Sequence, residues 1–473
     1  TTLSTVTLEV EDTLGITLEE VLQQGAEIQD AIDSVAPQMA RTNCGNPPLI
    51  TLYRIIDNRS VEDRVTVEQV VNAFNISGST LGVVSDPNYV IGRAPVDPQN
   101  LQRAEGDPDS GEGYAVSPPA GGSGEEEFYN QWAFHSMTTT LTNSVGIELF
   151  SSKATSTTIP PARTVPTAMG AGTLVAVFDT SPFDLQDVPL DSIDMVTVVN
   201  HQEVVGIPDT RDHGIFVASL VDAVAPAAEI RLYRVLNESN QGDLDTLLRA
   251  LDKLIFDPER VPRNPDRPLE GVVINLSLGI HEDPKLELTD VITVPVPTLH
   301  QKLNYARCLG AVIVAASGND SADSEPDSPV EAQVPASYDF VISVGASNFY
   351  GQRSCFSNAA NVYAPGGDND DDCMPIVSEC GSAPYHAACM VGSAVFVSPV
   401  THYAYWNGTS FAAPLVSGQA ALLLSTGTPP DEVMEVITAT AKVQTTTVSS
   451  ILGSDGAESI RIINIPASLN GTP

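Results

Sequence analysis

The sequence predicts an α/β fold with a central parallel sheet, preceded by a small α+β unit. Continuous Val/Ile runs recur along the chain, as in residues 174–178 (LVAVF) and 271–278 (GVVINLSL), and segments with helical spacing separate them. Strands that are apolar on both faces are typical of parallel sheets covered by helices on both sides. The first 93 residues differ, because their strand-like and helical segments alternate in the order β-α-β-α-β over a shorter length.

Residues 1–93 are expected to form a small sheet with helices on one face. Alternating apolar and polar residues predict its strands, and apolar residues three or four positions apart predict its helices. The expected strands are residues 5–11, 50–57 and 81–91, and the expected helices are residues 18–36 and 65–74.

The texture changes at residues 94–127, where eleven of 34 residues are Pro or Gly, eight are acidic and only Arg103 is basic. This composition predicts an exposed linker that a peptidase can cleave. An ordered surface loop of the next domain is the alternative, since long loops without structure are uncommon.

Residues 128–473 return to strand and helix alternation, which is interrupted at 366–405 by an acidic, Cys-bearing insertion. In open parallel sheets ligands bind at the carboxyl ends of the strands. Asp179, Gly279 and the pair Gly318 and Asn319 all follow such strand ends. The expected strands are 174–178, 229–236, 271–278, 311–316 and 341–346, before a closing segment at 460–469. The expected helices are 214–224, 244–256, 299–308 and 429–441, with a further helix inside 407–424.

Charge and hydropathy exclude several partners. The 473 residues include 22 basic and 60 acidic ones, which gives a net charge of −38. A chain this acidic lacks the basic stripe that neutralises phosphates, so we expect no nucleic-acid partner and no electrostatic binding to anionic membranes. No apolar run approaches the ~20 residues that a membrane span needs.

Residues 407–424 (NGTSFAAPLVSGQAALLL) begin with a turn at 407–409 and, from Ser410 on, predict a helix that is apolar on nearly every face and therefore buried. Pro414 is expected in its first turn, where a missing N–H costs little. Ser410 lies at the start of the helix, where unpaired N–H groups and the positive end of the helix dipole favour a developing anion. Taken alone, a serine at this place is more often a helix cap.

Three further polar residues stand at the ends of buried elements: Asp179 and Asn319 follow strands, and His213 opens a helix. Each alone is better explained as a cap or turn residue. Together with Ser410 they supply what acyl transfer requires, namely a hydroxyl, a base, a carboxylate that orients the base, and an amide for the oxyanion. The chain order Asp179, His213, Ser410 is one of the known orders of such a triad.

Five motifs resemble those of the subtilisin-like serine peptidases, or subtilases. They are VAVFDTS at 175–181, HGIFVA at 213–218, Ser277–Leu278–Gly279, AASGN at 315–319 and GTSFAAP at 408–414. The resemblance implies a subtilisin-like three-layer fold over residues 128–473 and the activity of a serine endopeptidase acting on proteins or peptides.

The resemblance also implies roles for individual residues. Asp179 would orient His213, His213 would act as general base and then as acid, Ser410 would attack the carbonyl, and Asn319 would donate its amide to the oxyanion, joined by the Ser410 N–H. The substrate-binding residues implied by the same motifs are Ser277, Leu278, Gly279, Ala316, Ser317 and Gly318. This chemistry requires no cofactor.

The front of the chain resembles a subtilase propeptide. GVVSDPNYVIG at 82–92 is similar to the end of such a propeptide, and EEFYNQWAFHSM at 126–137 is similar to the start of a mature peptidase. Residues 1–93 would then be an inhibitory and chaperone domain of a self-processing zymogen, cleaved between Tyr89 and Phe128. An unrelated accessory domain is the alternative.

Some positions depart from the family pattern. Ser181 and Ile215 stand where Gly and Thr are usual, which puts local backbone geometry in doubt but removes no catalytic group. Ile280 replaces a second Gly after Ser–Leu–Gly, so we hypothesise that a crowded cleft narrows the specificity. Asp320, directly after Asn319, would favour a basic residue at P1, although surface charges act weakly.

Six cysteines leave several disulfide patterns open. Cys355, Cys373, Cys380 and Cys389 are candidates for local bridges, Cys308 is expected as a buried thiol, and Cys44 has no nearby partner. The acidic loop at 368–372 offers oxygen ligands for structural Ca²⁺ but lacks the register of an EF-hand, so the metal site stays unknown.

Cysteine usage and the family resemblance predict an extracellular protein, secreted or held at the cell surface. Thr1 is not expected to be the translated start, because it lacks an initiator Met. The rival to an active peptidase is a non-catalytic extracellular scaffold that retains the subtilase fold. Such a protein would be expected to have lost one of the four catalytic groups, and all four are present.

Overall fold

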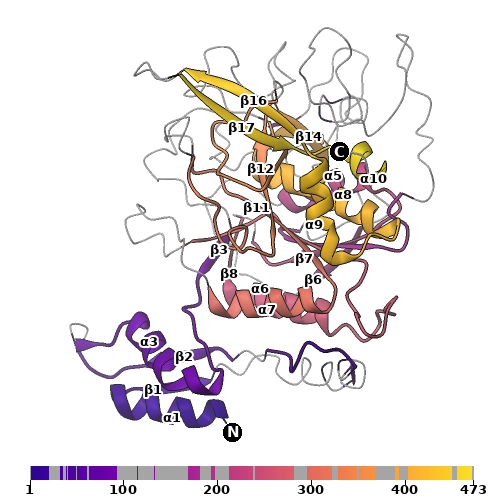
Figure 1. The fold of residues 1–473 in the computed structure, drawn as a ribbon. Coiled ribbons are helices and arrows are strands. Elements are labelled where there is room, and N and C mark those ends of the chain that lie inside the picture. Colours follow the sequence, from indigo (N-terminus) through magenta and orange to yellow (C-terminus); the bar gives the residue numbers. More distant parts are fainter. Residues whose placement is uncertain are drawn as a thin grey trace, which may run out of the picture.

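The computed structural model of the chain describes, with gaps, an N-terminal unit and much of the larger α/β domain that follows it (Figure 1). The described residues are 2–20, 32, 34–35, 39, 41–48, 51–60, 63–92, 114–115, 131, 133, 169–181, 193–197, 212–237, 240–281, 296–321, 329–348, 351–367, 389–393, 403–449 and 455–470. The expected linker at 94–127, apart from 114–115, and the larger part of the insertion at 366–405 lie outside them.

The larger domain is organised around a nine-stranded sheet with the strand order β16-β17-β13-β12-β11-β9-β5-β7-β6. All neighbours from β17 to β6 pair in parallel, and only β16 pairs antiparallel, with β17. This confirms the expected α/β fold. The strands are β5 (Leu174–Asp179), β6 (Ile193–Thr197), β7 (Glu229–Arg234), β9 (Val272–Leu276), β11 (Val312–Ala316), β12 (Ile342–Ser347), β13 (Val362–Pro365), β16 (Lys442–Ser449) and β17 (Asp455–Ile462).

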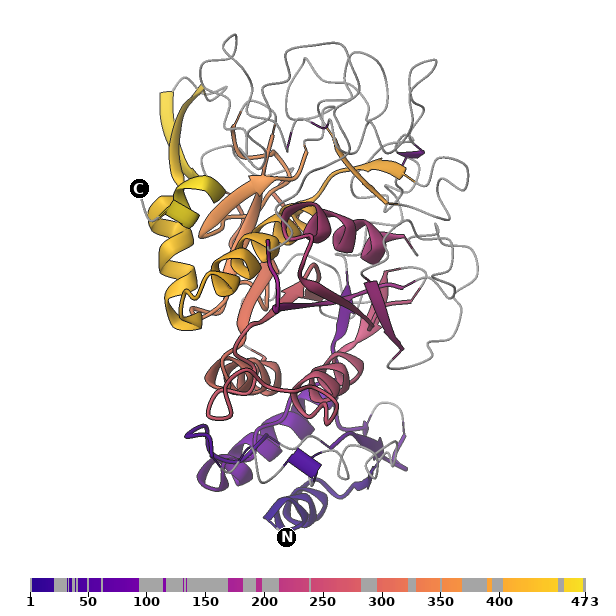
Figure 2. The ribbon, with the colours of Figure 1, turned by 90° about the vertical axis from the view of Figure 1, so that its right-hand side faces the viewer.

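Helices cover both faces of this sheet, so the domain has three layers (Figure 2). Because successive strand residues point to opposite faces, Val175 and Val177 belong to one core, whereas Ala176 and Phe178 belong to the other. The first core includes residues of α5 (His213–Val224), α8 (Thr409–Ser425), α9 (Pro430–Thr440) and α10 (Ile465–Asn470). The second core includes residues of α6 (Leu244–Ile255) and α7 (Pro297–Cys308).

Helix α8 runs through the first core, and all of its residues except Ser410 and Ser425 are buried. A Cβ on Gly418 would lie 2.5 Å from Cβ of Val224, so the absence of a side chain allows α8 to approach α5 this closely. Pro414, expected in the first turn, instead lies inside the helix. Its missing N–H therefore leaves the Ser410 carbonyl without the usual helical donor.

The N-terminal unit has a small core of its own, which includes Val6, Val10, Leu18 and Phe74. The strand expected at residues 5–11 is wrong, because this segment belongs to helix α1. Val6 and Val10 lie four residues apart and are both fully buried, so helical spacing prevails over the alternation of Thr and Val. The elements are α1 (Thr2–Leu14), β1 (Thr17–Glu20), β2 (Tyr53–Ile56), α3 (Val67–Gly78), a 3-10 turn η2 (Ser79–Leu81) and β3 (Val90–Gly92).

Two other expectations for this unit meet different outcomes. The helix expected from residue 18 is wrong at its start, since β1 pairs antiparallel with β2 there. The helix expected at 65–74 is present as α3, which begins with a capping box between Thr66 and Gln69.

A disulfide joins Cys44 to Cys308, 264 residues apart in sequence. The expectation of a buried Cys308 thiol and of an unpartnered Cys44 is therefore wrong. Cys308 lies at the exposed last turn of α7, and spacing rules cannot reveal a partner so distant along the chain. Of the candidates for local bridges, Cys389 is disulfide-bonded, whereas Cys373 and Cys380 lie outside the described residues.

Candidate active site

Asp179 and His213 form a buried pair at the carboxyl end of the sheet. Asp179 is the last residue of β5 and is fully buried, and His213 opens α5 with 4% of its surface exposed. Asp179 Oδ1 lies 2.7 Å from His213 Nδ1 and accepts a second hydrogen bond, also of 2.7 Å, from the Thr180 N–H. The carboxylate thus fixes the orientation of the imidazole ring, and Nε2 is left for another partner.

The start of α5 is fixed against the end of β5 by close backbone contact. The Gly214 N–H donates to Thr180 Oγ1 at 2.9 Å, and a Cβ on Gly214 would lie 2.0 Å from the Thr180 carbonyl oxygen. Aromatic rings enclose the imidazole, with centroids of Trp406 and Phe411 at 5.5 and 5.2 Å from that of His213. Any residue larger than Gly at position 214 would require the start of α5 or the Thr180 backbone to shift.

Ser410 is the second residue of α8 and is partly exposed. Its hydroxyl donates to the Ser277 carbonyl at 3.3 Å, and its own carbonyl accepts from the Ser277 hydroxyl at 2.9 Å. No hydrogen bond joins Ser410 Oγ to His213 in the described part of the chain. Phe411, the next residue, contacts the His213 ring, so the two side chains belong to one site.

A buried hydrogen-bond network connects Ser410 to the sheet. Asn275 Nδ2 donates to Ser277 Oγ at 3.0 Å, and Asn275 Oδ1 accepts from Ser417 Oγ at 2.8 Å. Asn275 and Ser417 are fully buried. Sequence reasoning missed this network, although an Asn inside the apolar run at 271–278 is the signal that could have revealed it.

Asn319 follows β11 and has its side-chain amide oriented by Thr409. Asn319 Oδ1 accepts from the Thr409 N–H at 3.0 Å and from Thr409 Oγ1 at 2.9 Å. Both contacts occupy the carbonyl end of the amide, which leaves the Nδ2 end to donate elsewhere. Nδ2 lies beside Gly408, 3.7 Å from the place a Cβ would take there, directly before Thr409 and Ser410.

The other expected substrate residues lie on two neighbouring strand ends. Ser277, Leu278 and Gly279 connect β9 to β10 (Gly279–His281), and Ala316, Ser317 and Gly318 follow from the end of β11. The Ser317 side chain is fully buried and donates to the Asn358 carbonyl, so it points inward.

Asn358 is a further residue that sequence reasoning missed. Its amide donates to Asp320 Oδ2 at 2.7 Å, and its Oδ1 accepts from the Asp320 N–H at 2.8 Å. Gln333 Nε2 also donates to Asp320 Oδ2, at 2.5 Å. The carboxylate expected to act at P1 is thus held by two neutral amides.

Strand β3 of the N-terminal unit lies between two strands of the larger domain. It pairs antiparallel with β10 on one side and with β8 (Gln241–Asp243) on the other. Ile91 faces Ile280 across one pair, and both side chains are buried in the second core. Ile280 therefore does not prevent an extended segment from lying against β10.

The same unit caps two helices of the larger domain. The Thr298 N–H at the start of α7 donates to Asp86 Oδ2 at 2.7 Å, and the Asp245 N–H at the start of α6 donates to Asn88 Oδ1 at 2.9 Å. These contacts satisfy N–H groups that a helix leaves unpaired. Burial raises the pKa of Asp86, and the hydrogen bonds from Thr298 partly offset this.

Two further features concern metal binding and membrane spans. Among the described residues no cluster of His, Cys, Asp or Glu could hold a metal ion, and the acidic loop at 368–372 lies outside them. No helix in the described ranges is long and apolar enough to cross a membrane.

Known proteins similar to this chain are serine proteases. A thermophilic serine proteinase of Bacillus sp. (strain AK1) is 32% identical over 248 residues, which are 49% of this chain and 47% of that protein. Subtilisin Savinase of Lederbergia lenta is 30% identical over 270 residues, 54% of this chain and 77% of that protein. The minor extracellular protease Epr of Bacillus subtilis (strain 168) is 29% identical over 162 residues, 32% of this chain and 20% of that protein.

The chain thus spans about half the length of the first of these relatives, 47%. Among solved structures, the epidermin leader peptide processing serine protease of Staphylococcus aureus superposes with a TM-score of 0.44 at 22% identity, covering 63% of this chain and 75% of that one. The profile of the Subtilase family matches residues 170–454, which hold Asp179, His213, Asn319 and Ser410. The chain therefore belongs to the subtilase family.

Proposed function

We propose that this chain is a serine endopeptidase in which Ser410 is the nucleophile, His213 the general base and Asp179 the residue that orients His213. The observation that carries the proposal is the 2.7 Å contact between the buried Asp179 and His213, beside a serine at the start of a buried helix. A buried carboxylate on Nδ1 fixes the tautomer with Nε2 unprotonated and stabilises the imidazolium that forms during attack.

The reaction begins when the Ser410 hydroxyl attacks the scissile carbonyl and passes its proton to His213 Nε2. In the structure this hydroxyl donates to the Ser277 carbonyl, so it must turn toward His213 first. Rotation about the Cα–Cβ bond of a partly exposed serine is fast, and hydrogen bonds of this kind often tighten only when a substrate is bound. His213 then returns the proton to the leaving amine, and water repeats the sequence to release the acyl group.

The negative charge on the carbonyl oxygen would be stabilised by Asn319 Nδ2 and by the Ser410 N–H. Thr409 supports this role because its two donors hold Asn319 Oδ1 and leave Nδ2 to donate. Such a donor contributes most when its position is fixed before the reaction begins.

Substrates would bind as extended peptide segments between β8 and β10, with main-chain contacts from the strand ends at Ser277–Gly279 and Ala316–Gly318. Strand β3 supports this because it occupies that place with antiparallel pairing on both sides. Its Gly92 lies opposite Gly279, so the direction of the strand leads toward Ser277 and Ser410. We infer that the N-terminal unit inhibits the peptidase as a zymogen and that a cut between Tyr89 and Phe128 is a step of its activation.

An exported protein fits these features. Epr, one of the relatives, is described as extracellular, and disulfides persist mainly in oxidising compartments.

The test is active-site labelling with a fluorophosphonate, combined with hydrolysis of a chromogenic peptide, after limited proteolysis of the linker and treatment with a dithiol that frees the N-terminal unit. We expect one adduct, on Ser410, and peptide hydrolysis that disappears in Ser410→Ala and His213→Ala. A chain that keeps its fold but gives neither adduct nor hydrolysis after the N-terminal unit has been removed would be the non-catalytic scaffold instead.

A further inference from the structure

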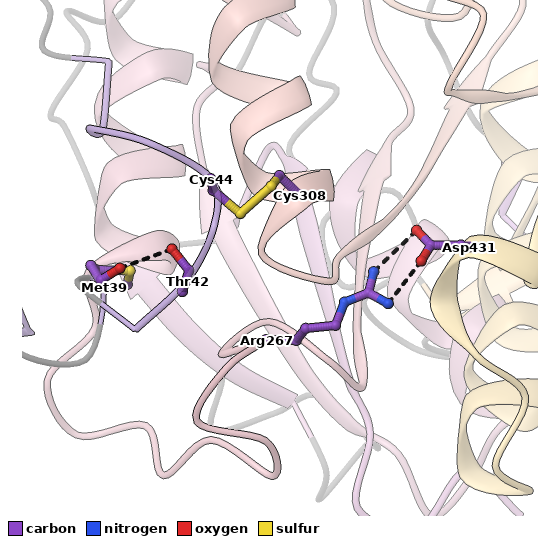
Figure 3. The surroundings of a disulfide bond; sticks show 6 residues. All are labelled: Met39, Thr42, Cys44, Arg267, Cys308 and Asp431. Atoms are coloured by element: carbon purple, nitrogen blue, oxygen red, sulfur yellow. Dashed lines mark hydrogen bonds and ion pairs between the residues drawn. A yellow bond between two sulfur atoms is a disulfide. The ribbon is translucent and has the colours of Figure 1, made fainter.

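The disulfide between Cys44 and Cys308 crosses the boundary between the N-terminal unit and the larger domain (Figure 3). Cys44 precedes strand β3 and the linker in sequence, and Cys308 follows both. A cut anywhere in residues 94–127 therefore separates the polypeptide into two chains that remain joined by this bond.

The residues around Cys44 pack onto α6 and α7 rather than hanging free. Val35 and Met39 belong to the second core, and the Met39 carbonyl accepts hydrogen bonds from the Thr42 N–H at 3.0 Å and from Thr42 Oγ1 at 2.8 Å. This turn presents Cys44 to the end of α7 (Figure 3). Packing and hydrogen bonds around Cys44 thus hold it in position for the disulfide with Cys308.

A buried ion pair makes a further contact in the same area. Lys302 on α7 is 1% exposed and pairs with Asp252 on α6, and its Nζ also donates to the Pro48 carbonyl at 2.8 Å. The N-terminal unit therefore supplies an acceptor to an otherwise buried ammonium group. Its removal would leave Lys302 with one acceptor fewer.

The attachment at Cys44 is separate from strand β3, which occupies the place proposed for substrate. Residues 45–89 lie between the two. After a cut in the linker, β3 can leave its slot, but it stays near because Cys44 remains bound to α7. A tethered segment rebinds at an effective concentration on the order of millimolar, so dilution does not remove it.

We propose that the Cys44–Cys308 disulfide keeps the peptidase latent after its linker is cut, and that reduction of this bond by a small thiol releases the N-terminal unit. This inference rests on the proposed function, in which β3 blocks the cleft. It adds a chemical step to activation, since peptide-bond cleavage alone leaves the inhibitor attached.

The reduction is a thiol–disulfide exchange. A thiolate attacks one sulfur and forms a mixed disulfide, and a second thiol completes the reaction, so that two small thiols become one small disulfide and two protein thiols appear. Cys308 is exposed and Cys44 is half-buried, so a small thiol can reach the bond.

The experiment uses the full chain with a recognition sequence for a site-specific peptidase inserted between residues 104 and 113. A first version carries Ser410→Ala, so that no self-cleavage confuses the result. After the cut, intact mass under non-reducing conditions is expected to show one species that contains both chains. Two separate masses without a reductant would overturn the proposal.

A second version keeps Ser410 and reports cleft access as the rate of fluorophosphonate labelling at nanomolar protein. We expect slow labelling of the cut, oxidised protein and a rise of about 100-fold after a dithiol is added, in line with the loss of a tether. In Cys44→Ser/Cys308→Ser the cut protein is expected to label rapidly without a dithiol, and the dithiol is expected to add nothing. If cut Cys44→Ser/Cys308→Ser at nanomolar concentration labels as slowly as the cut, oxidised protein that keeps both cysteines, the disulfide has no role in latency.

Arg267→Ala is the matched control, because Arg267 and its partner Asp431 lie near the disulfide but form no part of it (Figure 3). This variant should respond to the dithiol as the unsubstituted chain does. If the larger chain, freed of the N-terminal unit and still folded by circular dichroism, never reacts with the fluorophosphonate, the proposed peptidase function fails. The mass measurement on Ser410→Ala then still decides whether the tether holds.

Discussion

The hydroxyl of Ser277 donates to the carbonyl of Ser410 at 2.9 Å. This bond is present because Pro414, four residues after Ser410, cannot supply the helical N–H that this carbonyl would otherwise accept. A proline inside the helix thus connects the start of α8 to the strand end expected to bind substrate. The position of the proposed nucleophile depends on Ser277 as well as on its own helix.

Ser277→Ala is expected to lower kcat/KM for a peptide substrate and to destabilise the fold by about 1–3 kcal/mol, because the Ser410 carbonyl then lacks a donor. Steady-state kinetics and denaturant unfolding measure the two effects. Ser417→Ala is the matched control, since it removes the hydrogen bond from Ser417 to Asn275 in the same buried network and leaves the contacts of Ser410 in place. Equal losses of kcat/KM in both variants would show that Ser277 acts only through general stability.

Asn319→Ala is expected to lower kcat by about 10²–10³-fold with little change in KM, because the donor acts on charge that develops only in the transition state. Thr409→Val removes the hydroxyl that orients the amide but keeps the Thr409 N–H contact, so a smaller loss of kcat should follow. A rise in KM without a fall in kcat would place Asn319 in substrate binding instead.

Ile91→Ala is expected to weaken the docking of strand β3, because Ile91 is fully buried and an Ile to Ala change in a core costs about 2–5 kcal/mol. If about 1.4 kcal/mol or more of this lost stability weakens the docking of β3, fluorophosphonate should label Ser410 of the uncut chain at least ten times faster. Ile76→Ala, on α3 of the same unit, is the control, since Ile76 is 76% exposed. An unchanged rate in Ile91→Ala would mean that β3 does not limit access to Ser410.

Tyr233 gives a prediction at alkaline pH. Burial raises its pKa from 10.0 to about 12, so between these values the folded protein keeps a proton that the unfolded chain has lost. Its contribution to stability is complete below pH 10 and is lost as pH rises through 12, at about 1.4 kcal/mol per pH unit. Tyr233→Phe should flatten the fall in the free energy of unfolding over that interval in pH-dependent denaturant titrations, and parallel curves for both proteins would refute the assignment.

The sheet could be predicted from sequence because its signal is local. The Val/Ile runs of β5, β9, β11 and β12 report burial on both faces, and every residue in them is buried. The helices α5, α6 and α7 followed from spacing, and α8 from apolar residues on nearly every face. Helix α1 did not, because Thr and Val alternate over a segment in which Val6 and Val10 also satisfy helical spacing.

In the candidate site, too, local sequence signals could be read, whereas contacts between distant residues could not. Asp179, His213, Asn319 and Ser410 were selected from sequence because each stands at the end of a buried element. The contacts that position them and their neighbours depend on residues distant in sequence, such as Thr409 for Asn319, Ser277 for Ser410 and Asn358 for Asp320. The partner of Cys44 was hidden for the same reason, since only the fold brings Cys308 next to it.

The second core draws Val35, Met39 and Ile91 from the N-terminal unit. During synthesis these three residues leave the ribosome long before α6 and α7. The N-terminal unit that covers the apolar side of α6 and α7 is therefore made before these two helices. The contacts between them span a long stretch of chain and form late, since closing such loops is slow. A larger domain synthesised without residues 1–93 would have to fold with the apolar side of α6 and α7 uncovered, so aggregation during its synthesis is the expected failure, unlike a domain that loses the unit after it has folded.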